Sequence, residues 1–401
     1  AGTIFRLGSL PQNDLGSIRN FVSSFMATED NTTVNLSDYD SNISFIDGAN
    51  NFSSPTQTFF LQKGQSVVIS GNVTNGYPSA NLRGFVGALL TSDKPIVVNT
   101  GNLCGGMDTP TEGQDFNLDQ IVPYDQIGDE YVIMKGNGDD ITERPLVIAH
   151  EDNTQIFING NSTPIITLNA GDYFLVPTFN FQGSGSNKNM YLSGNKKFYL
   201  YQIVAGNLGH ATNGFFFIPP LNCFWQKSVD MIPEINKIGN FLYTSDLILA
   251  TQAGATVTIN GIPTTAIPVT VAGNPNWESY RINNLSGNVT VESTSPIAVG
   301  VFGSSGVAGF GGYFSGFGAS PKGATVDLCT GQIINLFDKI TGNPDAGGTW
   351  YYGSTSNPPR ANGGLFDPSD PIGSPLGDYF YVFTKNCPGQ PSETIEIKIT
   401  V

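Results

Sequence analysis

The amino-acid sequence predicts an all-β protein: three repeated β-sandwich-like units packed together, followed by a smaller C-terminal β-sandwich. Three observations support this prediction. Turn-forming glycine (48 residues) and proline (25 residues) are abundant, whereas charged residues are only 13% of the 401 residues, about half the ~25% typical of globular domains. Apolar residues alternate with polar ones in short runs, which is typical of half-buried strands. One set of sequence blocks occurs three times.

The clearest repeated block is a turn flanked by strands. It reads TEDNTTVNLS at 28–37, HEDNTQIFING at 150–160 and TQAGATVTING at 251–261. Asparagine and aspartate favour such corners because they hydrogen-bond to their own turn backbone. An alanine precedes each turn, and a strand, a glycine and a second strand follow it. The alanines are Ala27, Ala149 and Ala250, and the glycines are Gly64, Gly171 and Gly273.

Each unit opens with an apolar residue and a proline, and then, after a short spacer, an apolar residue, a glycine and an aromatic residue. The three opening blocks are 10–21, 122–131 and 232–241. These blocks predict units of about a hundred residues each, the size of small β-sandwiches. The proline-containing joints favour tight packing over free linkers. The predicted units are about 10–121, 122–231 and 232–321, within one region that covers 1–321.

The sequence changes in character near residue 320, and its last part ends in two alternating strands, DYFYVFT and ETIEIKITV. We therefore predict a separate domain at 324–401. Four cysteines allow three disulfide pairings. The pairing that keeps each bridge within one domain joins Cys104 to Cys223 and Cys329 to Cys387. A bridge would contribute about 2–4 kcal/mol to a domain with so small a core.

Charge and export signals narrow the possible functions. The net charge is −15, from 18 basic and 33 acidic residues, which disfavours binding to nucleic acid or to an anionic membrane surface. No apolar run is long enough to cross a bilayer, so we expect no direct membrane insertion. The chain starts with Ala1 rather than methionine, which we interpret as a mature secreted chain whose export signal has been removed. The even cysteine count fits an extracellular location at the cell surface.

Region 1–321 resembles the N-terminal domain family named for IgGFc-binding protein, which is widespread in secreted proteins of Bacteroidetes. The resemblance lies in TSDKPIVVNTGNLCGG, in DQIVPYDQIGDEYVI and in the order of the blocks. The C-terminal region resembles the Ig-like modules of gliding-motility-associated cell-surface proteins, through LCTGQIINLFDKITGNPDAGGTW and FDPSDP. This second resemblance implies an Ig-like fold and export by type IX secretion. The resemblance of region 1–321 carries over no antibody-binding residues.

The EDNT turns are candidate calcium sites, because hard cations favour clustered oxygen ligands. Glu151 and Asp152 are the weak candidates for such a site. The third unit has Ala253 and Gly254 in place of the acids and keeps the flanking strands. We therefore favour a structural turn and expect no cofactor or metal. The segments GNGDD and DPSDP are interpreted in the same way, because neither has the spacing of an EF-hand calcium loop.

The sequence argues against an enzyme. Its two histidines are His150 and His210, and no nucleophile, zinc or phosphate-loop motif occurs. Aromatic residues give a better candidate site: Tyr313, Phe314 and Phe317 could bind a sugar or a partner if exposed. The favoured alternative is that this segment and NGFFFIPP (213–220) pack where units meet, with glycine allowing close approach.

We therefore predict a non-catalytic extracellular cell-surface protein, an adhesin or a surface-filament component. It would act by weak multivalent contacts with a cell-surface or glycan partner. A carbohydrate-binding module or lectin is the alternative, and a secreted polysaccharide hydrolase is a weaker one. Self-assembly through exposed sheet edges is a further possibility.

Overall fold

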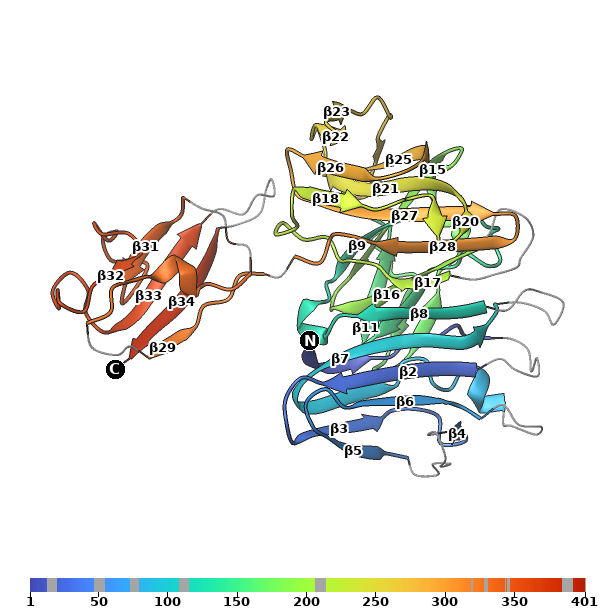
Figure 1. The fold of residues 1–401 in the computed structure, drawn as a ribbon, viewed down its shortest axis with the longest axis horizontal. Helices are drawn as coiled ribbons and strands as arrows, with labels where there is room; N and C mark the ends of the chain where they lie inside the picture. The colour runs from blue at the N-terminus through green and yellow to red at the C-terminus, as the bar shows by residue number, and fades with distance from the viewer. Residues whose placement is uncertain are drawn as a thin grey trace.

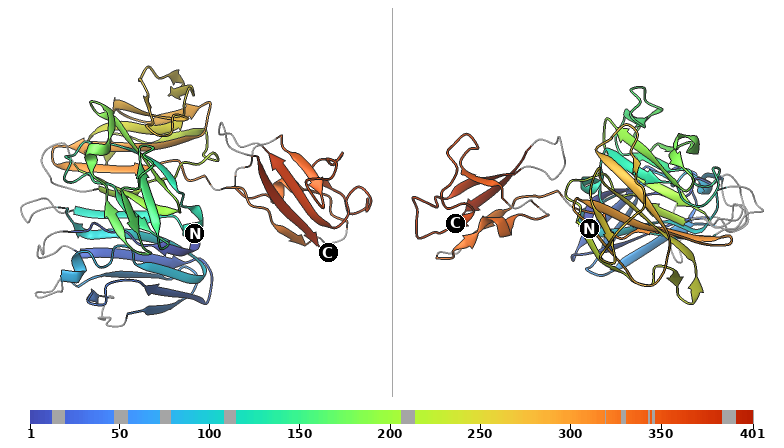
Figure 2. Two further views of the ribbon diagram at one scale, coloured as in Figure 1. Left: turned by 180° about the vertical axis from the view of Figure 1, so that it is seen from behind. Right: turned by 90° about the horizontal axis from the view of Figure 1, so that it is seen from above.

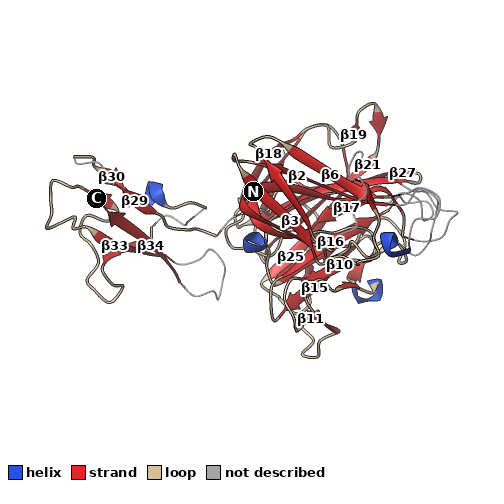
Figure 3. Ribbon diagram, turned by 90° about the horizontal axis from the view of Figure 1, so that it is seen from below, coloured by secondary structure: helices blue, strands red, loops and turns tan. Residues whose placement is uncertain are grey.

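The computed structural model describes residues 1–12, 20–46, 55–72, 79–107, 115–205, 214–318, 320–327, 331–342, 344, 347–383 and 392–400. The predicted all-β fold is confirmed, because these residues form strands and a few single helical turns (Figures 1 and 3). The 3₁₀ turns are η1 (Ser79–Leu82), η2 (Tyr124–Gln126), η3 (Thr178–Asn180) and η4 (Leu336–Lys339).

The first unit is one sheet folded around its own core. Its central order is β4-β6-β2-β7-β3-β5, and β1 and β8 both pair with the long strand β7. One half of β7 pairs with β3 and the other half with β2, so this strand joins both layers of the unit. The strands are β1 (Gly2–Arg6), β2 (Asn20–Ala27), β3 (Thr32–Ser37), β4 (Phe45–Ile46), β5 (Gln57–Leu61), β6 (Ser66–Gly71), β7 (Leu89–Gly105) and β8 (Asp115–Ile121).

The second unit has two sheets. Sheet 2a has the order β13-β10-β16-β17, and sheet 2b has the order β12-β11-β15-β14 with β9 on β15. The strands are β9 (Glu130–Met134), β10 (Leu146–Ala149), β11 (Thr154–Ile158), β12 (Ile166–Leu168), β13 (Tyr173–Leu175), β14 (Gln182–Ser184), β15 (Asn187–Gly194), β16 (Phe198–Val204) and β17 (Gly214–Phe217).

The third unit also has two main sheets. Sheet 3a has the order β24-β25-β21-β27-β28, and sheet 3b has the order β18-β26-β22-β23. A hairpin of β19 and β20 precedes β21. The strands are β18 (Ser228–Ile232), β19 (Lys237–Ile238), β20 (Phe241–Leu242), β21 (Thr244–Gln252), β22 (Val257–Ile259), β23 (Ile262–Pro263), β24 (Val269–Thr270), β25 (Trp277–Leu285), β26 (Val289–Ser293), β27 (Ile297–Ser305) and β28 (Ala308–Tyr313).

The three units share one pairing plan. In each unit, the strand that ends near the repeated alanine pairs on one side with the strand after the repeated glycine. On its other side it pairs with a later strand of the same unit. The three orders are β6-β2-β7, β13-β10-β16 and β25-β21-β27. The single strand β7 corresponds to two strands in each later unit, β15 with β16 and β26 with β27. The opening blocks are less regular. Blocks 10–21 and 232–241 lead towards β2 and β21, whereas 122–131 leads into β9, which takes the place of β1.

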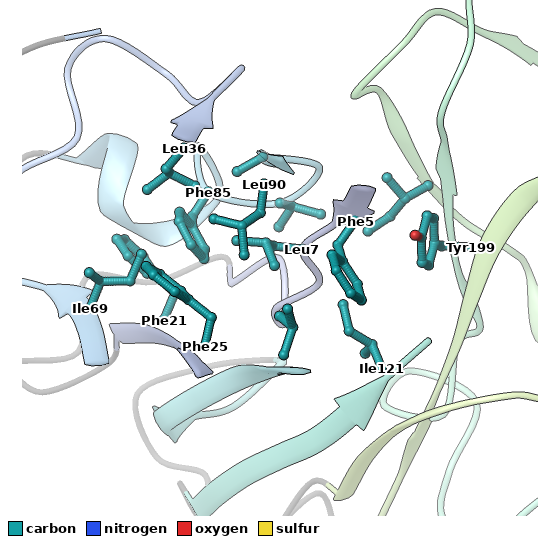
Figure 4. Packing of buried hydrophobic residues seen from close by; sticks show 14 of the residues in the cluster. Phe5, Leu7, Phe21, Phe25, Leu36, Ile69, Phe85, Leu90, Ile121 and Tyr199 are labelled. Carbon is teal, nitrogen blue, oxygen red and sulfur yellow. The ribbon is translucent and has the colours of Figure 1, made fainter. Parts of the chain in front are cut away.

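The sheets of the second and third units stack in layers whose cores are continuous between units (Figure 1). Alternate residues of β10 show this arrangement. Leu146 and Ile148 join the core shared with the first unit, whereas Val147 and Ala149 join the core between sheets 2a and 2b. Figure 4 shows the shared core reaching from the first unit to Tyr199 of β16. Strands buried on both faces carry continuous apolar runs rather than alternation, which explains LVIA in β10 and FYLY before Gln202 in β16.

The layers continue into the third unit. In β9, Tyr131 and Ile133 face the core inside the second unit, and Val132 and Met134 face sheet 3a. In β21, Ile248 and Ala250 meet that same interface, while Leu247 and Leu249 face sheet 3b. Sheet 3b closes the stack with a polar outer side, where Ser228, Asp230 and Glu292 are exposed. Terminal repeats of stacked proteins need such polar outer faces.

Two buried arginines join neighbouring units. Arg6 of β1 donates from Nη1 to Asp38 Oδ2 (2.8 Å) and to Gly87 O (3.0 Å), and from Nη2 to His150 O (3.4 Å). Its contact with the His150 carbonyl links the first unit to the second. Arg281 of β25 makes the corresponding link between the second and third units, through the carbonyl oxygens of Lys135 (2.9 Å) and Ser186 (3.1 Å).

Asp119 of β8 lies where the first unit meets β17. Its Oδ2 accepts a hydrogen bond from the Phe217 N–H (2.7 Å). Burial raises the pKa of this carboxyl from 3.8 to about 6, and that hydrogen bond opposes the shift. The folded protein therefore binds a proton more tightly than the unfolded chain, so stability should fall as the pH rises from about 4 to about 6.

We expect Asp119→Asn to remove this pH dependence. The variant keeps an acceptor for the Phe217 N–H but cannot ionise, so above pH 6 it should be more stable than the wild type by on the order of 1–2 kcal/mol. Urea unfolding at pH 4.5 and pH 7.5 measures the difference. If the free energy of unfolding differed between the two proteins by the same amount at both pH values, this carboxyl would not control the pH dependence.

The C-terminal part is a smaller β domain beside the stack (Figure 2). Its main sheet has the order β29-β34-β33-β31, with β29 parallel to β34, and β30 pairs with β32. Alternate residues of β34 point into its core, as the sequence pattern predicts. The strands are β29 (Thr325–Asp327), β30 (Ile334–Asn335), β31 (Thr349–Tyr352), β32 (Leu365–Phe366), β33 (Gly377–Phe383) and β34 (Glu393–Thr400).

The predicted bridge between Cys104 and Cys223 is wrong. Cys104 lies on β7 opposite Asn20 and keeps its thiol, whereas Cys223 is disulfide-bonded. Cys104 belongs to the first unit, while Cys223 follows the second unit, next to the C-terminal domain. The prediction failed because two cysteines in the same predicted region need not lie close together. Cys329 and Cys387 lie outside the described residues.

Candidate functional site

A polar cleft of about 810 Å³ lies where the second unit, the third unit and the C-terminal domain meet. Its volume is in the range of small-molecule sites, ~300–1,000 Å³, which often form where domains meet. One wall is the segment after η2, a second is the Gly273–Trp277 turn, and the third includes Lys322 and Thr341. Cys223 and Phe224 also line it.

Two aromatic side chains form the inner part of the cleft. Trp277 is 6% exposed and packs edge-on against Trp225, with ring centroids 5.2 Å apart. Tyr191 of β15 donates its hydroxyl hydrogen to Glu130 Oε1 (2.5 Å). Burial and then the Glu130 carboxylate raise the pKa of Tyr191, so its hydroxyl stays protonated. The cleft therefore has a fixed inner surface with a carboxylate beside it.

The charges at the rim are mostly paired. Lys322 Nζ donates to Asp125 Oδ2 (2.8 Å), which joins the C-terminal side of the cleft to the second unit. Lys197 Nζ donates to the Asp125 carbonyl oxygen (3.5 Å). Asp129 is exposed, and its carboxylate has no hydrogen-bond partner among the described residues. The rim is thus close to neutral, with one carboxylate available to a ligand.

The C-terminal domain is held against this cleft by residues 222–224. Asn222 donates from Nδ2 to Gly318 O (2.7 Å) and accepts from the Phe224 N–H (2.8 Å). Phe224 packs into the C-terminal core against Phe383, with ring centroids 6.0 Å apart. A Cβ on Gly318 would lie 2.2 Å from Phe224 O, so only glycine fits here. These contacts fix the third wall of the cleft.

The predicted aromatic site is not assembled as a platform. Tyr313 packs in the core against Phe216, with ring centroids 5.9 Å apart, and its hydroxyl is buried. Phe314 and Phe317 are 49% and 42% exposed. The segment packs where units meet, as the favoured interpretation states, and Phe215, Phe216 and Phe217 are buried in the same region.

The oxygen atoms of the EDNT turns accept hydrogen bonds from within the protein. Asp152 Oδ1 accepts from the Ala170 N–H (3.0 Å), and Lys196 Nζ donates to the Asp152 carbonyl (2.8 Å). Glu151 accepts from the Tyr124 hydroxyl (2.6 Å). In the first unit, Asp30 bonds in the same way to the Lys63 N–H and to Lys94. Asn31, Asn153 and Gly254 take the positive-φ corner, with φ of 56°, 57° and 81°.

We expect calcium to leave the stability of these turns unchanged. Asp30 and Asp152 already accept main-chain hydrogen bonds, and Glu151 accepts the Tyr124 hydroxyl. No group of three or more acidic, histidine or cysteine ligands occurs among the described residues. The melting temperature should therefore be the same within about 1 °C in EDTA and in millimolar CaCl₂. A rise of several degrees with calcium would contradict this account of the turns.

The other sequence candidates have structural roles or lie outside the described part. His150 stacks on Tyr124, with ring centroids 3.9 Å apart, and burial lowers its pKa. In GNGDD, Asp139 accepts from the Ile141 and Thr142 N–H groups (3.0 and 2.8 Å). In DPSDP, Asp367 accepts from Ser369. His210 lies outside the described residues.

The sequence pattern of the family described as IgGFc binding protein matches residues 2–303, more than half of the chain. This chain belongs to that family. The match spans the stacked units up to β27 and stops before β28 and the C-terminal domain. In this member of the IgGFc binding protein family, most of the cleft lies in the matched part, and Gly318, Ser320, Lys322, Thr341 and Gly342 come from beyond it.

The other comparisons add no argument about this family member. Sidekick-1 immunoglobulin domains 1–5 are 12% identical, with 95% of this chain and 99% of that chain covered and a TM-score of 0.14. A tetra-tandem repeat from the extending region of a large adhesion protein is 12% identical, with 99% and 98% covered and a TM-score of 0.11. Scores this low establish no common fold. No curated protein matches the sequence.

The sequence reasoning missed the cleft residues. Asp129 and Glu130 lie within the repeated block DQIVPYDQIGDEYVI, and Trp277 is 6% exposed, so neither position has the pattern of a binding site. The polar turn GNPNW (273–277) was the available signal, since a run of amides before a tryptophan is unusual in a buried strand. Nothing in the sequence indicated that β15 and residues 222–224 would meet that turn.

Proposed function

We propose that this chain is a non-catalytic extracellular binding protein, an adhesin or surface-filament component, which binds its partner at the cleft. Family membership supports a binding role. The observation that carries the proposal is the position of the cleft, between a rigid stack and a C-terminal domain that is anchored by Phe224. We further propose that 1–321 and 324–401 are separate domains and that the second is Ig-like. No helix of the described part is long and apolar enough to cross a membrane.

The alternatives gain less support. A lectin site at Tyr313, Phe314 and Phe317 would lack one of its three rings, because Tyr313 packs against Phe216 and its hydroxyl is buried. Self-assembly by further end-on stacking is disfavoured at sheet 3b, whose outer side is polar. We find no arrangement in the described residues that favours a polysaccharide hydrolase over a binding protein.

Binding of the fluorescently labelled full chain to intact cells tests this proposal. We expect saturable binding that excess unlabelled chain displaces. Asp129→Asn and Asn276→Ala in the cleft should weaken it, while Gln182→Ala, an exposed amide on β14, should not. Immobilised immunoglobulin Fc belongs in the same experiment because of the family's name. Absence of saturable binding to every cell type and to Fc would contradict the proposed function.

A further inference from the structure

We propose that the cleft binds a neutral, polyhydroxylated ligand, a short oligosaccharide of two or three residues. This inference rests on the proposed function, because it names the class of partner that the cleft recognises. The first argument is size. A cleft of about 810 Å³ is open enough for more than one sugar ring and falls within the range of pockets that bury most of a small ligand.

The second argument is charge. Three carboxylates and two lysines line the cleft: Asp125, Asp129, Glu130, Lys197 and Lys322. Asp125 and Lys322 pair with each other (2.8 Å), and Glu130 accepts the Tyr191 hydroxyl (2.5 Å). A phosphate or sulfate group would have to break the ion pair and approach uncompensated carboxylates. A neutral ligand neither breaks the ion pair nor is repelled by the carboxylates.

The third argument is hydrogen-bonding capacity. The exposed residues Gln126 and Asn276 both line the cleft, and neither side chain has a hydrogen-bond partner among the described residues. Each amide offers two donors and one acceptor oxygen, and Asp129 adds a charged acceptor. Neighbouring sugar hydroxyls both donate and accept, so this mixture of groups suits them. A ligand that only accepts hydrogen bonds would leave the Asp129 carboxylate without a partner.

The fourth argument is the inner surface. Trp277 and Tyr191 are held by Trp225 and Glu130, so their rings are fixed before a ligand arrives. A sugar ring has a C–H face that packs on such an apolar surface while its hydroxyls reach the amides at the rim. Trp277 and Tyr191 are only 6% and 4% exposed, so they supply less contact area than an exposed ring would, and we expect weak binding by a single site.

A glycan array probed with the full chain, followed by calorimetric titration of the best neutral oligosaccharide, tests this inference. The Gln126→Ala/Asn276→Ala variant should bind about tenfold more weakly, because two side-chain hydrogen bonds are lost. Two controls, Gln182→Ala and Phe314→Ala/Phe317→Ala, should bind like the wild type. Both amides are exposed, and circular dichroism checks that each variant is folded.

Each outcome decides the matter. Weaker binding in the cleft variant alone supports the inference. Equal binding by the cleft variant, or loss in Phe314→Ala/Phe317→Ala instead, would place the sugar elsewhere and overturn it. Binding only to sulfated or sialylated glycans would also overturn it. The last outcome is that no glycan binds, although the chain still binds saturably to cells and needs Asp129 to do so. In that case the oligosaccharide inference fails and the proposed function stands.

Discussion

Arg281→Leu is expected to lower the free energy of unfolding by about 3–5 kcal/mol, the range for breaking a buried ion pair by removing one partner. The Arg281 side chain is 2% exposed and donates to Asp246 Oδ2 through Nε (2.9 Å) and Nη2 (2.7 Å). Leucine would leave the Asp246 carboxylate buried without its cation. It would also remove the donors that satisfy the Lys135 and Ser186 carbonyls across the unit boundary.

Urea unfolding of the full chain measures this effect. Lys322→Ala, which removes the exposed pair with Asp125, is the matched control and should cost less than about 1 kcal/mol. The double variant Arg281→Leu/Asp246→Leu should recover part of the loss, since it no longer buries an unpaired charge. A loss below 1 kcal/mol for Arg281→Leu would mean that this pair is hydrated and does not join the units.

Gly273→Ala is expected to destabilise the protein by about 3–5 kcal/mol. Gly273 has φ +86°, and a Cβ there would lie 2.2 Å from Gly160 N, a backbone atom of the second unit. A left-handed alanine costs about 1–2 kcal/mol, and the backbone overlap adds a steric term that no side-chain rotation relieves. The close approach exists because the third unit stacks on the second.

Gly64→Ala is the matched control for Gly273→Ala. Both glycines lie at the same place in their units, because each is the third residue of a four-residue turn. The turns are closed by the hydrogen bonds from Gln65 N to Gln62 O and from Asn274 N to Val271 O. Gly64 has φ +80° but nothing within 4 Å of its Cβ position. Its alanine variant should therefore lose only about 1–2 kcal/mol. Equal losses at the two positions would contradict the close contact between units.

Local patterns predicted the strands and turns better than they predicted what covers them. The corner at Asn31, Asn153 and Gly254 could be predicted, because positive φ selects asparagine and glycine. The two-sided burial of β10 could not, because a run of four apolar residues does not tell which sheet lies on either face. The block at 122–131 resembled the other openings because proline and glycine mark the entry to many strands.

The candidate site depended on contacts between distant segments, which no local pattern records. The glycine-rich strand of Tyr313 was expected to pack where units meet, but no local pattern indicated its partner Phe216, almost a hundred residues earlier. Cys104 and Cys223 were paired by assumed domain boundaries rather than by geometry. The cleft joins Asp129, Trp277 and Lys322 from three parts of the chain, so its existence follows from the stacking of units and from the anchoring of Phe224.

The central claim is that the three units form one stack with continuous cores. Pulse-labelled hydrogen exchange during urea unfolding of the full chain tests it, with peptides from β2, β16 and β27 reporting separately on the units. The stack predicts that all three peptides lose protection at one urea concentration, and that Gly273→Ala lowers this concentration for all of them. Three separate midpoints, with Gly273→Ala changing only that of β27, would contradict the claim.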